Sequence, residues 1–181
     1  MARELLGLPS GKRLLLFGAL NVTDKRKGID YLIEALRRME KQDVELVVFG
    51  QVKDDIRGLF PVPIHSMGYL SYESKIVALY NAVDMFITSS LEENLPNTIM
   101  ESMACGTPCV GFEIGGIPEM IDHRVNGYVA NYKDAGDLAN GIQWVLEHED
   151  RLALSDACVK KVQENYTEEV VAKQYTALYE K

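Results

Sequence analysis

Two glutamates, Glu93 and Glu101, are separated by seven residues in the segment that offers the most chemistry in the chain. Glu93 precedes a predicted helix over 94–104, and Glu101 lies about two turns inside it, on the order of 11 Å from the helix start. The free amides around Leu95 and Asn97, together with the positive end of the helix, would hold an anion between the two carboxylates. Because a carboxylate accepts hydrogen bonds from neighbouring hydroxyls, this order suits a sugar, a diphosphate and a ribose. On spacing alone, two solvated helix charges explain the glutamates more simply.

Three cations, Lys25, Arg26 and Lys27, stand together after the first predicted strand and directly before Gly28. In a chain of formal net charge −8, such a cluster at the carboxyl end of a strand is a candidate clamp for a diphosphate. A guanidinium binds phosphate oxygens through two hydrogen bonds, whereas a lysine acts as a compact point charge. A solvated surface loop is the alternative interpretation.

A third candidate is the glycine pair Gly115-Gly116, which precedes Ile117 and Pro118 at a predicted helix start. Glycine lets the backbone approach a ligand closely, and the amides of such a turn can complete an anion site. A plain turn between a strand and a helix explains the pair equally well.

The residues that bind metals in proteins are scattered. No Asp-x-Asp motif and no Cys-x-x-Cys pair is present, the cysteines are odd in number, and the histidines are His65, His123 and His148. We therefore predict packed, reduced thiols, structural histidines, and no metal or other cofactor. Positive side chains and helix amides would hold a diphosphate instead.

The elements that must position these groups follow from the hydrophobic pattern. Short apolar runs predict six strands, at 13–18, 44–50, 63–68, 84–88, 107–112 and 127–130. Apolar residues at helical spacing predict helices between them: one over 29–36, one capped by Ser71, and one over 94–104 with Pro96 in its first turn. Three helices without strands follow, over 137–148, over 151–164, and from the capping residue Thr167 onward.

Six strands that alternate with helices predict an α/β fold, a single Rossmann-like domain of three layers with a parallel, doubly wound sheet. The helical tail, residues 150–181, should pack over one side or edge of this sheet. Such sheets bind ligands at the carboxyl ends of their strands, near the point where the strand order reverses. Gly18, Gly68 and Leu70 follow strands and join the candidate residues at that edge.

Composition excludes several classes of protein. A net charge of −8 fits sequence-independent nucleic-acid binding poorly, because that binding depends on Lys and Arg. No apolar run approaches the ~20 residues of a membrane-spanning helix, and no signal-peptide core is visible, so we expect a cytoplasmic protein. The 181 residues fit one domain, with residues 1–12 as a linker left from a longer protein.

Taken in order, these motifs resemble one family. Glu93-x7-Glu101 is followed by a Met103–Pro108 stretch and then by Gly115–Glu119, an order similar to the C-terminal domain of the group 1 glycosyltransferases, GT4 enzymes of the GT-B fold. The motifs extend from about Leu14 to Gly127. The resemblance implies a retaining enzyme that moves a hexosyl group from a nucleoside-diphosphate sugar to a glycan or lipid-linked acceptor.

The resemblance also implies roles for the two carboxylates and the cations. Glu93 would contact the transferred sugar and Glu101 the ribose, and Lys27 stands at the family's phosphate-binding lysine. Ala19 stands where the family commonly has arginine, and we predict that Arg26 replaces it. The family's Gly-Phe-Gly after the first glutamate is Asn94–Pro96 in this chain, so the sugar contacts there differ from the family's pattern.

The remaining donor contacts implied by the resemblance come from backbone positions. The glycines Gly115 and Gly116 would lie against the sugar or the phosphates, with Leu95 and Asn97 at the helix start. The nucleotide base would sit near Gly68 and Leu70, with Gly18 at the end of the first strand.

The resemblance implies a second, N-terminal domain that binds the acceptor, and we expect that domain to lie outside these 181 residues. We therefore expect the 181-residue piece to bind nucleotide weakly and to have little transferase activity alone. The full enzyme could act at the cytoplasmic face of a membrane. Alternatives are half of a nucleotide-sugar 2-epimerase, a relative of the sugar phosphorylases, and a stand-alone nucleotide-binding or regulatory module.

Overall fold

The computed structural model describes residues 2–21, 24–39, 43–51 and 57–179. Six strands form one sheet in which every pairing is parallel, in the spatial order β3-β2-β1-β4-β5-β6. The strands are β1 (Arg13–Asn21), β2 (Val44–Gln51), β3 (Ile64–Gly68), β4 (Met85–Thr88), β5 (Cys109–Phe112) and β6 (Gly127–Ala130). The predicted α/β fold with a parallel, doubly wound sheet is confirmed.

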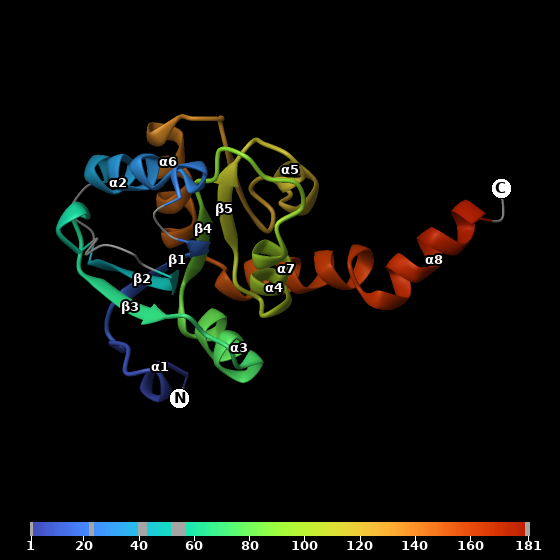
Figure 1. Cartoon of the computed structure of the whole chain (residues 1–181), viewed down its shortest axis with the longest axis horizontal. Helices are drawn as coiled ribbons and strands as arrows, with labels where there is room; N and C mark the ends of the chain where they lie inside the picture. The colour runs from blue at the N-terminus through green and yellow to red at the C-terminus, as the bar shows by residue number, and fades with distance from the viewer. Residues whose placement is uncertain (1, 22–23, 40–42, 52–56, 180–181) are drawn as a thin grey trace.

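Helices cover both faces of the sheet (Figure 1). They are α1 (Ala2–Leu5), α2 (Ile29–Arg38), α3 (Glu73–Ala82), α4 (Asn97–Ala104), α5 (Ile117–Met120), α6 (Ala135–Leu146), α7 (Arg151–Asn165) and α8 (Glu168–Tyr179), with short 3₁₀ turns η1 (Lys25–Lys27) and η2 (Arg57–Leu59). One face is packed by α2 and α6, and the other by α3, α4, α5 and α7. The result is the predicted three-layer arrangement.

The central strand β1 explains why the strands were visible as apolar runs. Leu15 and Phe17 face the core under α2 and α6, whereas Leu14 and Leu16 face the core under α3 and α4. All four side chains are almost fully buried. A parallel strand with helices on both sides has no solvent face, so its sequence is continuously apolar.

A carboxylate just before β4 ties distant parts of the chain together. Asp84 accepts hydrogen bonds from Arg3 at 3.0 Å, Arg13 at 3.1 Å and Arg151 at 2.6 Å, and from the Leu14 N–H at 2.8 Å. Burial alone would raise the pKa of Asp84, but the Leu14 amide and the Arg151 guanidinium outweigh it, so the pKa lies below its usual value. Asp84 thereby joins the N-terminal segment and α7 to the sheet.

Three predicted helix starts were wrong. The helix expected over 137–148 is α6, which begins at Ala135 after the capping residue Asp134. The helix expected to be capped by Ser71 begins at Glu73, because the first helical hydrogen bonds, from Lys75 and Ile76, end on the carbonyl of Tyr72. The helix expected over 94–104 begins at Asn97. Its N-cap is Pro96, which the prediction had placed inside the first turn.

The physical reason for the late start of α4 lies in the backbone. Pro96 is extended, with φ −71° and ψ 114°, and a proline also disfavours the helical conformation in the residue before it. Asn94 and Leu95 therefore belong to the loop after β4, which is longer than the sequence suggested.

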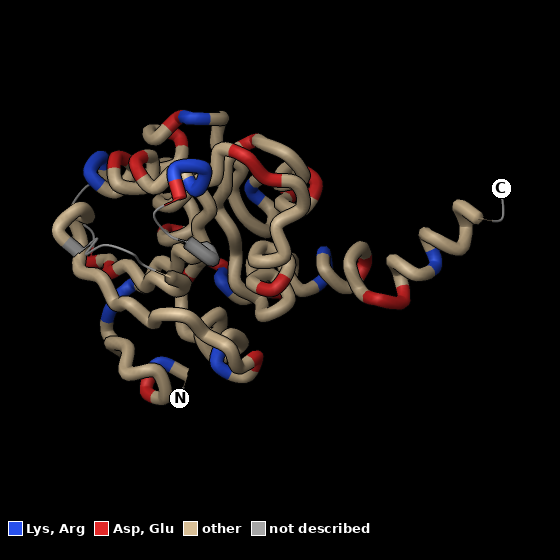
Figure 2. Tube along the Cα trace, viewed as in Figure 1, with Lys and Arg blue, Asp and Glu red and all other residues tan. Residues whose placement is uncertain are grey.

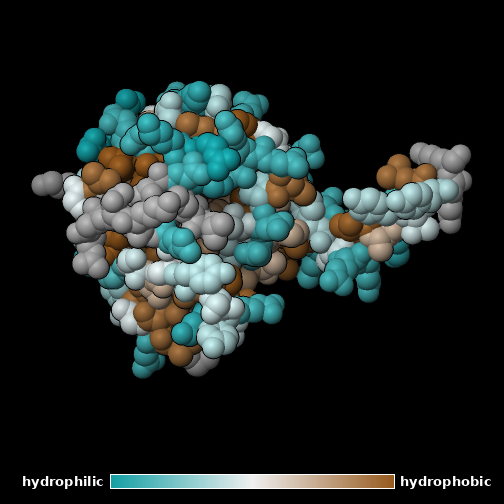
Figure 3. Space-filling view, viewed as in Figure 1, coloured by the Kyte–Doolittle hydropathy of each residue, from teal (hydrophilic) through white to brown (hydrophobic). Residues whose placement is uncertain are grey.

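The helical tail divides into two parts. Helix α7 packs against α4 and buries Leu154 and Cys158. Helix α8 has no buried residue and extends away from the sheet (Figure 1), so the prediction that the whole tail packs on the sheet was wrong for α8. Hydrophobic residues are exposed along α8 (Figure 3). The exposed large side chains of this helix include Leu178, Tyr175 and Tyr179. Within the described residues, no helix is long and apolar enough to cross a membrane.

Candidate functional site

The strand order creates a crevice between β1 and β4. The chain moves outward from β1 through β2 to β3, then returns to β4 on the other side of β1 and continues to β6. Neighbouring connections therefore leave the sheet in opposite directions, and parallel sheets bind ligands at this reversal. The loops that end there are the η1 loop after β1 and the Ser89–Pro96 loop after β4, so the predicted position of the site coincides with the switch point.

The η1 loop and the loop after β4 are joined by backbone contacts. The Ser89 hydroxyl donates to the carbonyl of Lys27 at 2.9 Å, and the Leu91 N–H donates to the carbonyl of Arg26 at 2.7 Å. Gly28 adopts φ +62°, and a Cβ there would lie 1.9 Å from the carbonyl oxygen of Ser89. Only glycine permits this approach, so Gly28 holds the lysine beside Ser89, the residue that follows β4.

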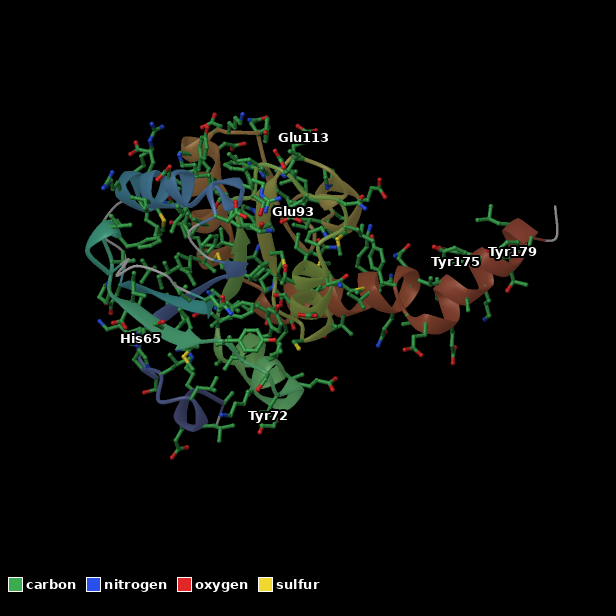
Figure 4. All side chains as sticks on the ribbon, in the orientation of Figure 1. His65, Tyr72, Glu93, Glu113, Tyr175 and Tyr179 are labelled. Atoms are coloured by element: carbon green, nitrogen blue, oxygen red, sulfur yellow. The ribbon has the colours of Figure 1, made fainter. Side chains whose placement is uncertain are left out.

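A cavity of about 400 Å³ opens between these loops, lined by Arg26, Lys27, Glu92, Glu93 and Asn94. Across it, the ammonium of Lys27 lies 2.6 Å from Oε1 of Glu93. The Glu93 side chain is 14% exposed and that of Lys27 is 31% exposed. In Figure 4 Glu93 lies at the same end of the sheet as Glu113, which follows β5. The structure thus brings together the predicted sugar carboxylate and the predicted phosphate lysine.

Arg26 is bound by its neighbour Asp24. Its guanidinium meets both carboxylate oxygens, with the shortest contact at 2.7 Å, and Asp24 also accepts from the Arg26 N–H at 2.9 Å. These hydrogen bonds lower the pKa of Asp24 to about 2. Figure 2 shows positive and negative positions side by side along the η1 loop and α2. Arg26 is 67% exposed, and its role as a substitute phosphate ligand stays a prediction.

The glycine pair shapes the other wall of the site. Gly115 adopts φ +55°, and a Cβ there would lie 2.0 Å from the carbonyl oxygen of Glu93. The Gly116 N–H donates to the carbonyl of Asn94 at 2.5 Å. The pair therefore holds the backbone that carries Glu93, and the Gly116 amide, which the sequence suggested for an anion, is engaged by Asn94.

The start of α4 offers fewer amides than expected. Pro96 has no N–H, and the Ile99 N–H already donates to the Pro96 carbonyl at 3.0 Å. The amides of Asn97 and Thr98 are the first that the helix presents. Leu95 precedes the helix and exposes its side chain.

Glu101 projects from α4, and its partner is Tyr80 of α3, which lies in the helix predicted after Ser71 but was not singled out there. The Tyr80 hydroxyl donates to Oε2 of Glu101 at 3.1 Å. Tyr80 is 1% exposed, and burial followed by the nearby charge of Glu101 raises its pKa. Tyr80 positions Glu101. The only sequence signal was a tyrosine on the buried face of a predicted helix.

The remaining predicted residues lie at the same end of the sheet but outside the cavity of Lys27 and Glu93. Gly18 was expected at the end of the first strand, but β1 continues to Asn21, so Gly18 lies inside the strand. A Cβ there would lie 1.9 Å from the ring of Phe49, so this glycine makes room for the Phe49 side chain. Gly68 ends β3 with φ +63° and open space around it, and Leu70 packs partly against the core. Among the described residues, no cluster of His, Cys, Asp and Glu could hold a metal ion.

Comparison with known proteins identifies the family. A family model described as "Glycosyl transferases group 1" matches residues 11–148. An uncharacterized glycosyltransferase of Methanocaldococcus jannaschii is 29% identical over 98% of this chain and 47% of its own length. The N-acetyl-alpha-D-glucosaminyl L-malate synthase of Bacillus anthracis is 30% identical over 61% of this chain and 29% of its own length. The chain spans less than half of these relatives.

Solved structures share the fold. Sucrose-phosphate synthase from Thermosynechococcus elongatus superposes with a TM-score of 0.81 at 25% identity, over 99% of this chain and 47% of that one. Anabaena HepE, solved in complex with UDP and glucose, superposes with a TM-score of 0.79 at 22% identity, over 99% of this chain and 51% of that one. Together with the site at the β1–β4 switch point, these matches show that the chain belongs to the group 1 glycosyltransferase family and corresponds to its C-terminal domain.

Proposed function

We propose that this chain binds a nucleoside-diphosphate sugar and is the donor half of a retaining glycosyltransferase that moves a hexosyl group to a glycan or lipid-linked acceptor. The observation that carries the proposal is the Lys27–Glu93 pair at the switch point of the sheet. A cation suited to phosphate lies beside a carboxylate suited to hydroxyls, and the close contacts at Gly28 and Gly115 hold the two loops that carry them; this supports the proposal.

The donor would extend from this cavity along α4. Lys27 and the Asn97 and Thr98 amides would meet the diphosphate, because a helix start presents free N–H groups and a positive dipole end. Glu93 would accept hydrogen bonds from the sugar. Glu101, held by Tyr80 on the flank of the same helix, would accept from the ribose.

The chemistry that these groups support is departure of the diphosphate. As the glycosidic bond breaks, negative charge grows on the phosphate oxygens, and preorganised positive groups stabilise that charge in the transition state. Lys27 and the amides of α4 would supply this stabilisation without a metal ion. A second domain would bring the acceptor, in keeping with relatives that are more than twice as long as this chain.

Calorimetric titration with UDP, GDP and ADP tests the proposal. We expect one nucleotide to bind preferentially, and Glu101→Ala to weaken its binding at least about tenfold, since a hydrogen bond to a charged group contributes roughly 1.5–3 kcal/mol. Glu169→Ala removes an exposed carboxylate of α8 and is the matched control. Binding that is equal for Glu101→Ala, Glu169→Ala and the unaltered chain would refute the ribose assignment, and binding of no nucleotide would refute the function.

A further inference from the structure

The cations of the candidate donor site are already neutralised by carboxylates of the chain itself. Arg26 is held by Asp24, and Lys27 by Glu93. Glu92 also lines the cavity and adds a further negative charge. An incoming diphosphate therefore meets no net positive charge in this cavity unless one of the two ion pairs opens.

The two ion pairs differ in how firmly they are held. Asp24 meets the Arg26 side chain through three hydrogen bonds and also caps its backbone N–H, all within one short turn. Lys27 and Glu93 are 66 residues apart and share one hydrogen bond between two separate loops. Opening the second pair costs one contact and requires only side-chain rotation, so Lys27 is the cation that can change partner.

A freed Glu93 then needs a new partner. Its side chain is 14% exposed, and a carboxylate that loses its cation in such a position pays a desolvation cost unless hydrogen-bond donors replace it. A nucleoside diphosphate brings only acceptors to this end of the cavity. A nucleoside-diphosphate sugar brings hydroxyls, which can donate to the carboxylate.

We infer that Glu93 is an internal competitor for the phosphate site on Lys27, and that the sugar of the donor relieves this competition by supplying hydroxyl donors to Glu93. The inference rests on the proposed function. It assigns to Glu93 the discrimination between the nucleoside-diphosphate sugar and the nucleoside diphosphate that remains after transfer. A donor with its sugar opens the pair and keeps it open. Once the sugar has been transferred, Glu93 returns to Lys27 and favours release of the diphosphate.

The test compares matched pairs of probes, UDP with UDP-glucose, GDP with GDP-mannose, and ADP with ADP-glucose, by titration calorimetry at one salt concentration. Glu93→Gln keeps the side-chain volume and removes the competing charge. We expect it to bind the diphosphate roughly fivefold more tightly, which corresponds to the ~1 kcal/mol of a partly exposed ion pair. The nucleotide sugar should bind no more tightly, so the preference for the sugar-bearing ligand falls.

Two control variants distinguish a change of partner at Lys27 from a general loss of negative charge in the cavity. Glu92→Gln removes the same charge from the same cavity without touching Lys27, and we expect less than a twofold gain for the diphosphate. In Lys27→Gln, the added Glu93→Gln change should bring no gain, which completes a double-mutant cycle.

Two results would overturn the exchange of partners at Lys27 while leaving nucleotide binding intact. One is an equal gain in diphosphate affinity in Glu93→Gln and Glu92→Gln, and the other is weaker diphosphate binding in Glu93→Gln. Failure of every variant to bind any of the six probes would instead overturn the proposed function, and the exchange with it. Thermal melting of each variant shows that the fold is retained.

Discussion

The contact between Gly115 and the loop after β4 gives a prediction that can be compared with a second glycine of the chain, Gly7. Gly115→Ala introduces two costs. Its backbone stays in the left-handed region at φ +55°, and the new Cβ lies 2.0 Å from the Glu93 carbonyl oxygen. Gly7→Ala shares the first cost, at φ +65°, but its Cβ would meet nothing within 4 Å. The difference between the two variants therefore isolates the close approach.

The magnitudes follow from these two terms. A left-handed backbone costs an L-residue roughly 1–2 kcal/mol, partly offset by about 0.4–1 kcal/mol from the less flexible unfolded chain. We thus expect Gly7→Ala to lose about 1 kcal/mol. Forcing an extra methyl into packed surroundings adds roughly 1–3 kcal/mol, so Gly115→Ala should lose about 3 kcal/mol, or roughly 6–12 °C of melting temperature for a domain of this size.

Urea unfolding of both variants, followed by circular dichroism, measures the two costs, and nucleotide titration measures the effect on the site. If the loop yields instead of the fold, Gly115→Ala loses less stability but binds nucleotide at least tenfold more weakly, because Glu93 moves with its carbonyl. Equal stability losses in Gly115→Ala and Gly7→Ala, with unchanged nucleotide affinity, would refute the reasoning from this contact.

Four further outcomes are expected. Tyr80→Phe removes the hydrogen bond to Glu101; it should cost about 1 kcal/mol of stability and weaken nucleotide binding about threefold, and an unchanged affinity in calorimetry would deny the positioning role. Because the folded-state pKa of Asp84 is lowered, its contribution is present above about pH 4 and is lost as pH falls below that value. Asp84→Asn should therefore cost about 3 kcal/mol at pH 7 and flatten the acid dependence of urea unfolding, whereas a parallel dependence would contradict the assignment. Burial raises the pKa of Cys158 to about 12, so a thiol reagent at pH 7 should label the partly exposed Cys105 first by mass spectrometry, and labelling of Cys158 in the folded chain would count against its burial. Adding EDTA should leave nucleotide affinity unchanged, and a loss of binding would point to a metal.

The sheet could be predicted because its sequence signal is local. The inner strands β1, β4 and β5 are buried on both faces, so runs such as Leu14–Phe17 are apolar at every position. The edge strand β3 has no buried residue and gives a weaker signal, and the intervening helices carry one apolar stripe. The alternation of the two patterns leaves little choice of fold class, and the edge that binds ligands then follows from the direction of the strands.

The partners of the site residues could not be predicted, because they depend on contacts between distant segments. The pairing of Lys27 with Glu93 joins two loops that only the sheet brings together. The hydrogen bond from Tyr80 to Glu101 joins two helices, and a buried tyrosine carries no local mark of such a role. The prediction was also wrong at Pro96. A proline is typical of a first helical turn, but Pro96 is extended and stands before the first turn of α4.

The strand order also divides the molecule into two halves that are each continuous in sequence. Strands β1 to β3 lie on one side and β4 to β6 on the other, and within the sheet only the β1–β4 ladder joins them. Lys27 belongs to the first half and Glu93 to the second. A cut in the exposed turn at 71–72, between β3 and α3, would leave two fragments whose reassembly completes the ion pair. The cavity is therefore an intramolecular interface between two segments that are synthesised one after the other.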